Sequence, residues 1–360
     1  MNDAMALARW ACETMMGRFA PQDLPPKGHF HYHQGVFLWG MLQVWQLDGN
    51  KELLDYARGW LDAVLGPDVT PRDFVPGELD DIQPGNLLFP VWEATGDPRY
   101  RRAMDAVYAQ YARIPRCACG GYCHKPDLPG QMWLDGLYMG GPFLARYAAL
   151  TGQPALWQQV AEQIFLMARN TRDDATGLWR HAWDEPLRAP WADPGTGCSP
   201  EFWGRSLGWV PLALLDDLDA MPAGFAPREQ ILALLQSLLH SLCRYQGEDG
   251  RWYQVVDKAG AAGNWPENSC TCLFAAALYK AVRLGYLPPS LLPAAGRGYD
   301  GVVRSLTGQD GEFCLGQVCI GTGVGDYRYY CGRPVSTNDL HGMGAFLLMC
   351  TERERLHRAR

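Results

Sequence analysis

The chain has 360 residues, of which 48% are hydrophobic and 12% aromatic, and its formal net charge is −7. This composition can fill a large core and excludes a disordered chain. The negative charge, with no run of Lys or Arg, gives no electrostatic footprint for nucleic acid or an anionic membrane, so we expect neither as a partner.

Apolar residues recur with the helical period in twelve segments, which we predict to be helices. The expected helices cover 3–17, 35–48, 51–65, 82–95, 98–113, 135–151, 154–170, 205–220, 226–245, 269–285, 289–305 and 338–351. The first segment is interrupted by charged residues and lacks the basic end and apolar stretch of a signal peptide. No later window reaches about 18 uninterrupted apolar residues, so we expect a cytoplasmic protein without a transmembrane helix.

Short connections join some of these helices in pairs. Gly49 stands between the second and third helices, Gly96 between the fourth and fifth, and Gly152 between the sixth and seventh. Glycine ends a helix in the left-handed conformation, and proline, as at positions 98 and 154, opens the next helix at its first turn. The pattern predicts tight helical hairpins.

The connections between hairpins are long and carry turn signals followed by strand-like residues. Such signals occur at 120–122, 174–179, 248–252 and 310–313, and predict small β-hairpins at one end of the molecule. Alternation of tight turns with long loops indicates a repeat architecture. We therefore predict an all-α fold, an (α/α)6 barrel of six helical hairpins in a single catalytic domain over residues 1–360, with a pocket at the rim where the long loops gather.

Chemically coherent side chains occupy those long loops. Carboxylates, imidazoles, an arginine and indoles occur just before the expected helices; they stand at 29–35, 78–81, 133–135, 181–185 and 202–209. Aromatic faces stack on sugar rings, arginine pairs with a carboxylate, and aspartate transfers protons. The combination indicates a small acidic oligosaccharide as the ligand.

The segment 126–143 is the most informative, because Asp135 follows Trp133 at the start of an apolar helix. An acidic residue in the first helical turn also stabilises the helix dipole, which is the alternative interpretation of Asp135. That alternative leaves Trp133 unexplained. An indole beside a carboxylate suits a sugar that stacks on the ring and is protonated at its edge.

Other residues of the loops have structural alternatives as well. His29, His31 and His33 alternate as in a strand, so either some of them face solvent or the three form a metal site. Asp80 or Asp81 can cap the fourth helix. Arg205 and Trp209 lie one helical turn apart and can simply stack on each other.

Twelve cysteines are too dilute for a disulfide scaffold, so we expect free thiols. Cys117, Cys119, Cys123 and His124 lie within eight residues and offer four soft ligands for zinc. Their spacing is not one of the common zinc patterns. We interpret these cysteines as ordinary thiols, with a structural zinc ion as the alternative.

Several motifs resemble the unsaturated rhamnogalacturonyl hydrolases of glycoside hydrolase family 105, which are related to the family 88 glucuronyl hydrolases. The similarity covers most of the chain. The segments that carry it are 31–35 (HYHQG), 79–82 (LDDI), 132–144 (MWLDGLYMGGPFL), 181–185 (HAWDE) and 202–209 (FWGRSLGW).

The resemblance implies an enzyme that acts on oligosaccharides made by a polysaccharide lyase, including fragments of the rhamnogalacturonan of pectin. Their non-reducing uronic acid, galacturonyl or glucuronyl, carries a C4=C5 double bond, which is hydrated before the ring opens by itself. Asp135 matches the acid and base that protonates C4 and activates water for C5. Asp80, or alternatively Asp81, matches the second carboxylate. The matching pocket residues are Tyr32, Trp133, His181, Arg205 and Trp209.

All of these roles are filled by side chains, so we expect no cofactor and no catalytic metal. One rival function is a sugar epimerase of the N-acylglucosamine 2-epimerase type, which has a similar barrel. Its proton transfer needs two histidines facing each other across the pocket, and His181 with His341 or His33 is the only such hint. The other rival is a non-catalytic sugar-binding barrel, which would keep the tryptophans without needing Asp135.

Overall fold

Helices account for most of the computed structural model, which describes residues 3–309 and 311–360. The helices of one set are α2 (Tyr32–Asp48), α4 (Leu88–Thr95), α6 (Asp135–Thr151), α8 (Gly204–Ala220), α10 (Asn268–Arg283) and α13 (Leu340–Arg358). Those of a second set are α1 (Ala4–Arg18), α3 (Lys51–Val64), α5 (Pro98–Tyr111), α7 (Pro154–Thr171), α9 (Arg228–Cys243) and α11 (Leu292–Ser305). A 3₁₀ helix, Gln83–Leu87, leads into α4, and α12 is a short turn of helix, Tyr327–Cys331.

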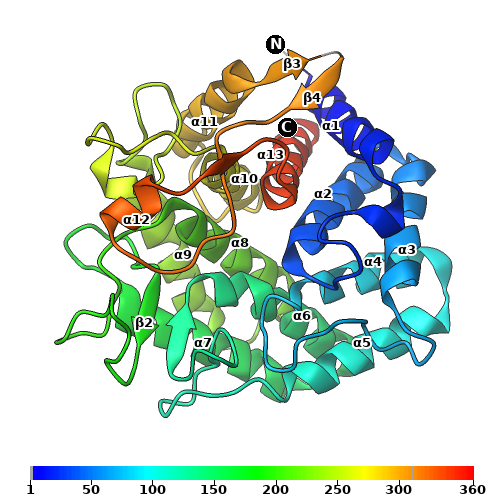
Figure 1. Ribbon diagram of the computed structural model, residues 1–360, viewed down its shortest axis with the longest axis horizontal. Helices are drawn as coiled ribbons and strands as arrows, with labels where there is room; N and C mark the ends of the chain where they lie inside the picture. The colour runs from blue at the N-terminus through cyan, green and yellow to red at the C-terminus, as the bar shows by residue number, and fades with distance from the viewer. Residues whose placement is uncertain (1–2, 310) are drawn as a thin grey trace.

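The first set forms a closed inner ring. From α2 the contacts run through the 3₁₀ helix before α4 to α6, α8, α10 and α13, and α13 packs back on α2 (Figure 1). The inner helices α8 and α10 are buried along nearly their whole length. The outer helix α3 buries only one stripe at helical spacing, Leu53, Tyr56, Ala57, Trp60, Leu61 and Val64. The predicted (α/α)6 barrel is confirmed.

Tight turns join α2, α4 and α6 to the outer helices that follow them, where the sequence predicts such turns. Gly49, Gly96 and Gly152 have φ values of 74°, 67° and 66° and end α2, α4 and α6 in the left-handed conformation. This conformation carries a steric penalty for residues with a Cβ atom. The sixth pair differs, because it joins the two ends of the chain: α1 packs on α13.

The long connections carry short antiparallel pairs. Strand β1 (Gln131–Trp133) pairs with β2 (Ala182–Asp184), β3 (Thr307–Gln309) with β4 (Glu312–Cys314), and β5 (Val318–Cys319) with β6 (Val335–Ser336). Isolated bridges close the expected turns at 120–122 and 174–179, and β3–β4 closes the turn at 311–313; Asp310 lies outside the described residues. The pairing of β1 with β2 was not predicted.

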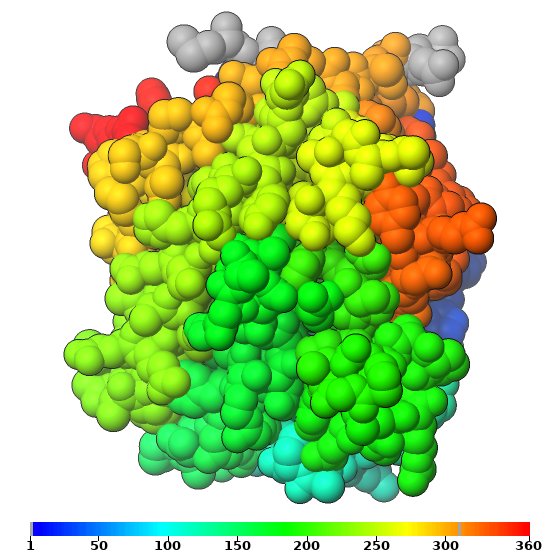
Figure 2. Space-filling view, turned by 90° about the vertical axis from the view of Figure 1, so that its left-hand side faces the viewer, coloured from blue at the N-terminus to red at the C-terminus, as the bar shows by residue number. Residues whose placement is uncertain are grey.

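Loops from remote parts of the chain meet along one edge of the barrel. In Figure 2 the green segment before α8, the yellow segment before α10 and the orange segment around α12 lie beside one another. Hydrogen bonds link them: the Tyr327 hydroxyl donates to the carbonyl of Ala262 over 2.9 Å, and the Lys258 ammonium pairs with Glu201. Among the described residues, no helix combines the length and the apolar character that crossing a bilayer requires.

Candidate active site

A cavity of about 290 Å³ opens among these loops. It receives residues from the connections that precede α2, α4, α6, α8 and α13, which agrees with the predicted pocket at the loop end of the barrel. The lining residues are His31, Tyr32, His33, Asp80, His124, Lys125, Trp133, Asp135, Met139, Trp203, Arg205, Gly321, Thr322 and Gly323.

Asp135 reaches the cavity because strand β1 ends just before it and α6 begins with it. Strand pairing sets Trp133 opposite Ala182, and the Leu134 amide donates to the carbonyl of His181 over 2.9 Å. The register therefore brings His181 to Asp135. The His181 Nε2 atom lies 3.0 Å from Asp135 Oδ2, and the Asp135 side chain is 13% exposed, whereas that of His181 is fully buried.

Tyr330 of α12 fixes the other side of the His181 ring. Its hydroxyl lies 2.6 Å from His181 Nδ1 and accepts a hydrogen bond from the Gly325 amide over 3.2 Å. The Tyr330 oxygen already accepts one hydrogen bond, and the proton of this buried hydroxyl needs an acceptor. We therefore assign the Tyr330 hydroxyl as the donor to His181 Nδ1. With Nδ1 as the acceptor, the N–H of His181 lies on Nε2 and is donated to Asp135.

Asp80 and Asp81 have different environments. Asp80 lines the cavity, 3.2 Å from the Lys125 ammonium and 3.7 Å from His124 Nε2. Asp81 is turned to His31 Nδ1 at 2.8 Å and accepts the Val75 amide at 2.7 Å. The geometry therefore brings Asp80 to the site and assigns Asp81 to holding the 75–81 loop against His31.

Burial alone would raise the pKa of Asp80, but neighbouring cationic groups outweigh burial and lower this pKa to about 2. Burial also lowers the pKa of His124, which is therefore neutral at pH 7. The groups that lower the pKa of Asp80 are His124, Lys125 and His31, and of these Lys125 is the one that keeps its charge at neutral pH. The Lys125 ammonium also pairs with Glu78, so that one cation serves two carboxylates.

Two aromatic side chains line the cavity as predicted. Trp133 stacks on the His124 ring, with centroids 4.4 Å apart and an angle of 20° between the planes, so one indole face is covered by protein. Its indole N–H donates to Gln131 over 3.1 Å. Tyr32 lies beside His33, with centroids 4.2 Å apart. A sugar can therefore stack only on the second face of Trp133.

Arg205 is 1% exposed and lies at the cavity with its guanidinium over the ring of Trp203 at 4.5 Å. It donates to the carbonyl oxygens of Cys319 and Ile320 over 2.5 and 2.7 Å, and Glu267 is 4.0 Å away. Because a guanidinium has five N–H donors, these two bonds leave donors for a ligand.

Trp209 does not line the cavity, contrary to the expectation for this residue. It is buried and stacks on Tyr138, with centroids 4.8 Å apart and planes at 16°. Trp203, one and a half turns closer to the rim, provides the indole instead, and Arg205 stacks on Trp203 rather than on Trp209. His181 also lies behind the surface of the cavity, where it contacts Asp135.

The N-terminal histidines do not form a three-histidine metal site in the described part of the chain. His29 is exposed, His31 pairs with Asp81, and His33 lies beside His341, with ring centroids 5.2 Å apart. Burial and the neighbouring His341 lower the pKa of His33 to about 3, so His33 is neutral at pH 7. His33, Asp339 and His341 bring possible ligand atoms within 4.8 Å of one another; His341 Nε2 donates to the Cys319 carbonyl over 3.0 Å, and its Nδ1 lies 2.8 Å from Asp339 Oδ1.

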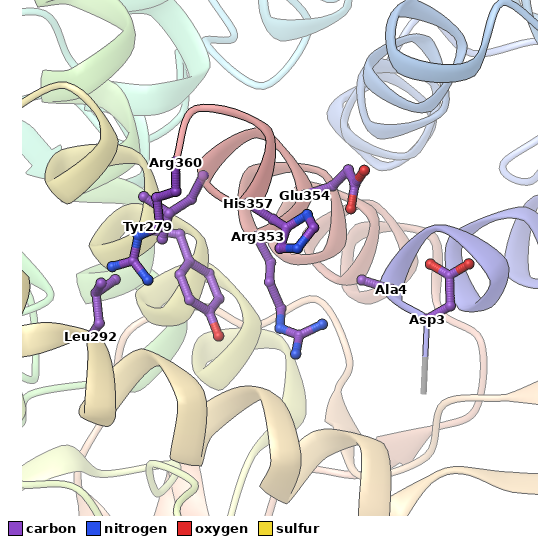
Figure 3. A pocket seen from close by; sticks show the side chains of 9 residues that line it. Asp3, Ala4, Tyr279, Leu292, Arg353, Glu354, His357 and Arg360 are labelled. Carbon is purple, nitrogen blue, oxygen red and sulfur yellow. The ribbon is translucent and has the colours of Figure 1, made fainter. Parts of the chain in front are cut away.

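Two other cavities are larger but chemically poorer. One, of about 360 Å³, lies at the end of α13 and is lined by Tyr279, Arg353, His357 and Arg360, among others (Figure 3). The other, of about 690 Å³, is a groove beside α7 and α9. Neither is lined by tryptophan. The smaller cavity with Asp135, Asp80 and Trp133 is therefore the candidate active site.

Four of its important residues were not predicted as site residues. The sequence indicates His124 only as a zinc ligand, does not mark Lys125, and contains Trp203 only as part of the segment 202–209. Their positions next to the recognised motifs were the available signal. Tyr330 had no such signal, because it reaches His181 from a segment 149 residues further along the chain.

The family model described as Glycosyl Hydrolase Family 88 matches residues 7–357. A solved family 105 glycoside hydrolase from C. acetobutylicum ATCC 824 superposes with a TM-score of 0.91 at 31% identity, over 96% of this chain and 99% of that chain. The unsaturated glucuronyl hydrolase of Bacillus sp. GL1 has the same fold, with a TM-score of 0.74 at 16% identity over 99% of this chain and 96% of that chain.

Curated relatives agree with this assignment. Protein Atu3128 of Agrobacterium fabrum is 34% identical over 229 residues, which are 59% of this chain and 97% of that protein. The unsaturated 3S-rhamnoglycuronyl hydrolase of Alteromonas sp. is 25% identical over 61% of this chain and 50% of that protein. The resemblance to family 105 and the related family 88 is confirmed: the chain belongs to Glycosyl Hydrolase Family 88 and is a glycoside hydrolase similar to the family 105 enzymes.

Proposed function

We propose that this enzyme removes a 4,5-unsaturated uronic acid from the non-reducing end of small oligosaccharides made by polysaccharide lyases, with unsaturated galacturonyl fragments of the rhamnogalacturonan of pectin as the first candidates. The observation that carries the proposal is the setting of Asp135. This carboxylate lines the cavity, and only its Oδ2 atom takes part in a hydrogen bond within the described part of the chain. Its Oδ1 atom is left for a substrate.

The reaction needs one group that first gives and then takes a proton. Asp135 in its protonated form donates the proton to C4 of the enol ether, and the resulting carboxylate takes a proton from the water that adds at C5. Hydration produces a hemiketal, which opens and releases the neighbouring sugar. The N–H of His181 stabilises the ionised form of Asp135 and fixes its orientation.

The remaining residues bind and orient the sugar. Asp80, kept ionised by Lys125, is placed to accept hydrogen bonds from sugar hydroxyl groups. The uncovered face of Trp133 provides a stacking surface, and Tyr32 lies on the same cavity. Arg205 supplies the charge for the uronate carboxylate, because Lys125 is already neutralised by Glu78 and Asp80.

The epimerase alternative is not supported by the position of the histidines. His33 lies on the cavity, but His181 is buried behind Asp135, and His341 is buried beside His33 rather than across from it. No pair of these imidazoles therefore flanks the cavity. A binding protein without activity would not need the ordered arrangement of Tyr330, His181 and Asp135.

The test is the loss of the ultraviolet absorbance of the enol ether in a panel of lyase-generated unsaturated disaccharides. We expect the absorbance to fall with wild-type enzyme, and Asp135→Asn to lower kcat by about 10²–10⁴-fold while substrate binding is retained. Asp127→Asn is the matched control, since it makes the same change on an exposed carboxylate eight residues away. Near-normal turnover by folded Asp135→Asn, or no change of absorbance with any member of the panel, would contradict the proposal.

A further inference from the structure

Two thiols and one carboxylate, Cys117, Cys119 and Glu185, lie close together outside the cavity, and a third thiol, Cys123, lies beside Cys117. The Cys117 and Cys123 sulfur atoms are 3.5 Å apart, and the ligand atoms of Cys117, Cys119 and Glu185 all lie within 4.8 Å of one another. Glu185 comes from the segment after β2, whereas the cysteines belong to the loop before β1. From this geometry we propose that Cys117, Cys119, Cys123 and Glu185 form a structural zinc site.

The loop that carries the cysteines is shaped to gather them. Arg116 and Tyr122 form a β-bridge, and the Cys117 amide donates to the Gly121 carbonyl over 2.7 Å. Gly120 makes the turn with a φ of 92°, a conformation that glycine adopts without strain. The hairpin thus holds Cys117 and Cys123 side by side, with Cys119 at its tip.

Glu185 is fixed in this loop by two backbone groups. The amides of Ala118 and Cys119 donate to its two carboxylate oxygens over 2.5 and 2.8 Å. Its own amide donates to the Gly130 carbonyl over 3.0 Å, which ties the segment to β1. A bound cation would balance the negative charge of the Glu185 carboxylate beside the cysteine sulfur atoms.

The distances suit zinc. With Zn–S bonds of about 2.3 Å, tetrahedral coordination separates two sulfur ligands by about 3.8 Å, close to the Cys117–Cys123 separation of 3.5 Å. Three thiolates with one carboxylate select zinc over calcium or magnesium, which prefer oxygen ligands.

His124 is not one of the ligands, although the sequence placed it with the cysteines. Its ring stacks on Trp133, and its Nε2 atom is directed to Asp80 at 3.7 Å. The carboxylate that replaces it could not be seen from the spacing of the cysteines, because it comes from another segment of the chain. None of the four proposed ligands lines the catalytic cavity, so the ion is structural.

Cys119 gives the ion a route to the site. It is partly exposed and lines the groove of about 690 Å³ beside α7, together with Gly120. Cys117 and Cys123 are buried. Zinc at this position would cross-link the loop before β1 to the segment after β2, directly behind His124 and Trp133.

The experiment uses the full chain. Purified from zinc-containing medium, it should contain one zinc ion per chain by elemental mass spectrometry. Apo-protein titrated with Co²⁺ should develop the thiolate charge-transfer and tetrahedral d–d absorption bands. We expect Cys119→Ser and Glu185→Gln to weaken Zn²⁺ binding at least about tenfold. Cys243→Ser, a partly exposed cysteine outside the cluster, should bind as the wild type does.

A stability measurement separates metal binding from misfolding. Adding Zn²⁺ should raise the Tm of the wild-type apo-protein and of Cys243→Ser but not that of Cys119→Ser, because an ion that binds only the folded state stabilises it. The proposal is overturned if the wild type binds neither Zn²⁺ nor Co²⁺, if Cys119→Ser and Glu185→Gln bind as tightly as wild type, or if the native chain has lost two hydrogen masses to a Cys117–Cys123 disulfide.

Discussion

Replacing Tyr330 by phenylalanine would test how the position of the Asp135 carboxylate is controlled. The change removes one hydroxyl and keeps the ring, which stacks on Trp203 with planes 14° apart. The hydroxyl is 2.6 Å from His181 Nδ1, so its loss leaves a buried nitrogen without its partner. The imidazole is then free to turn away or to carry its proton on Nδ1, and the N–H donated to Asp135 is lost.

Leaving a buried polar group unsatisfied costs about 1–3 kcal/mol. If that cost appears in the transition state, kcat falls by about 5- to 150-fold, at about 1.4 kcal/mol per factor of ten. We expect KM to change little, because Tyr330 does not line the cavity. The assay is the steady-state loss of enol-ether absorbance.

Tyr329→Phe is the matched control. The Tyr329 hydroxyl accepts the Gly323 amide over 3.1 Å, much as Tyr330 accepts Gly325, but it makes no contact with His181. The Tyr329→Phe variant should therefore keep near-normal kcat. An unchanged kcat in Tyr330→Phe, or an equal loss in both variants, would refute the relay from Tyr330 through His181 to Asp135.

Two further predictions concern the charged groups of the cavity. Arg205→Ala should lower kcat/KM on the free uronic acid by about tenfold to a few hundredfold, the range for a charge-assisted contact, and much less on the methyl ester; an equal loss on both substrates would mean that Arg205 acts by holding the carbonyls of Cys319 and Ile320. Lys125→Met removes one of the cationic groups that lower the pKa of Asp80, so this pKa should rise and the acidic limb of the pH–rate profile should move to higher pH. An acidic limb identical to that of the wild type would show that ionised Asp80 is not needed.

The fold could be predicted because its signals are local. Apolar residues at helical spacing predict each helix. Gly49, Gly96 and Gly152 predict turns that need a residue in the left-handed conformation. The closing pair of α1 with α13 has no local signal, since its helices come from the two ends of the chain. The pairing of β1 with β2 was missed for a related reason: three residues in each strand are too few to show a pattern.

The site was predictable to the extent that its residues stand at the starts of inner helices. Asp135, Trp133, Tyr32 and Arg205 do, Asp80 stands in the loop before the 3₁₀ helix that leads into α4, and all five line the cavity. Trp209 illustrates the limit of the method. The spacing of four residues from Arg205 predicts on which side of α8 the Trp209 side chain lies, but not how far it is from the rim of the barrel. Trp209 lies one turn further from the rim than Arg205 and stacks on Tyr138 in the core.

The residues that hold Asp135 in place, His181 and Tyr330, are far from it in the sequence. This separation along the chain explains why the sequence predicted Asp135 but not the contacts that orient it. Asp135 is positioned by the start of α6. Its hydrogen-bond partner, His181, is positioned by the pairing of β1 with β2, and the partner of His181, Tyr330, belongs to α12. The same β1–β2 pairing carries Glu185 to the three thiols. One short strand pair therefore serves two purposes: it orients the proposed catalytic carboxylate on the cavity side, and on the other side it brings together the proposed metal ligands that would hold the pair in register.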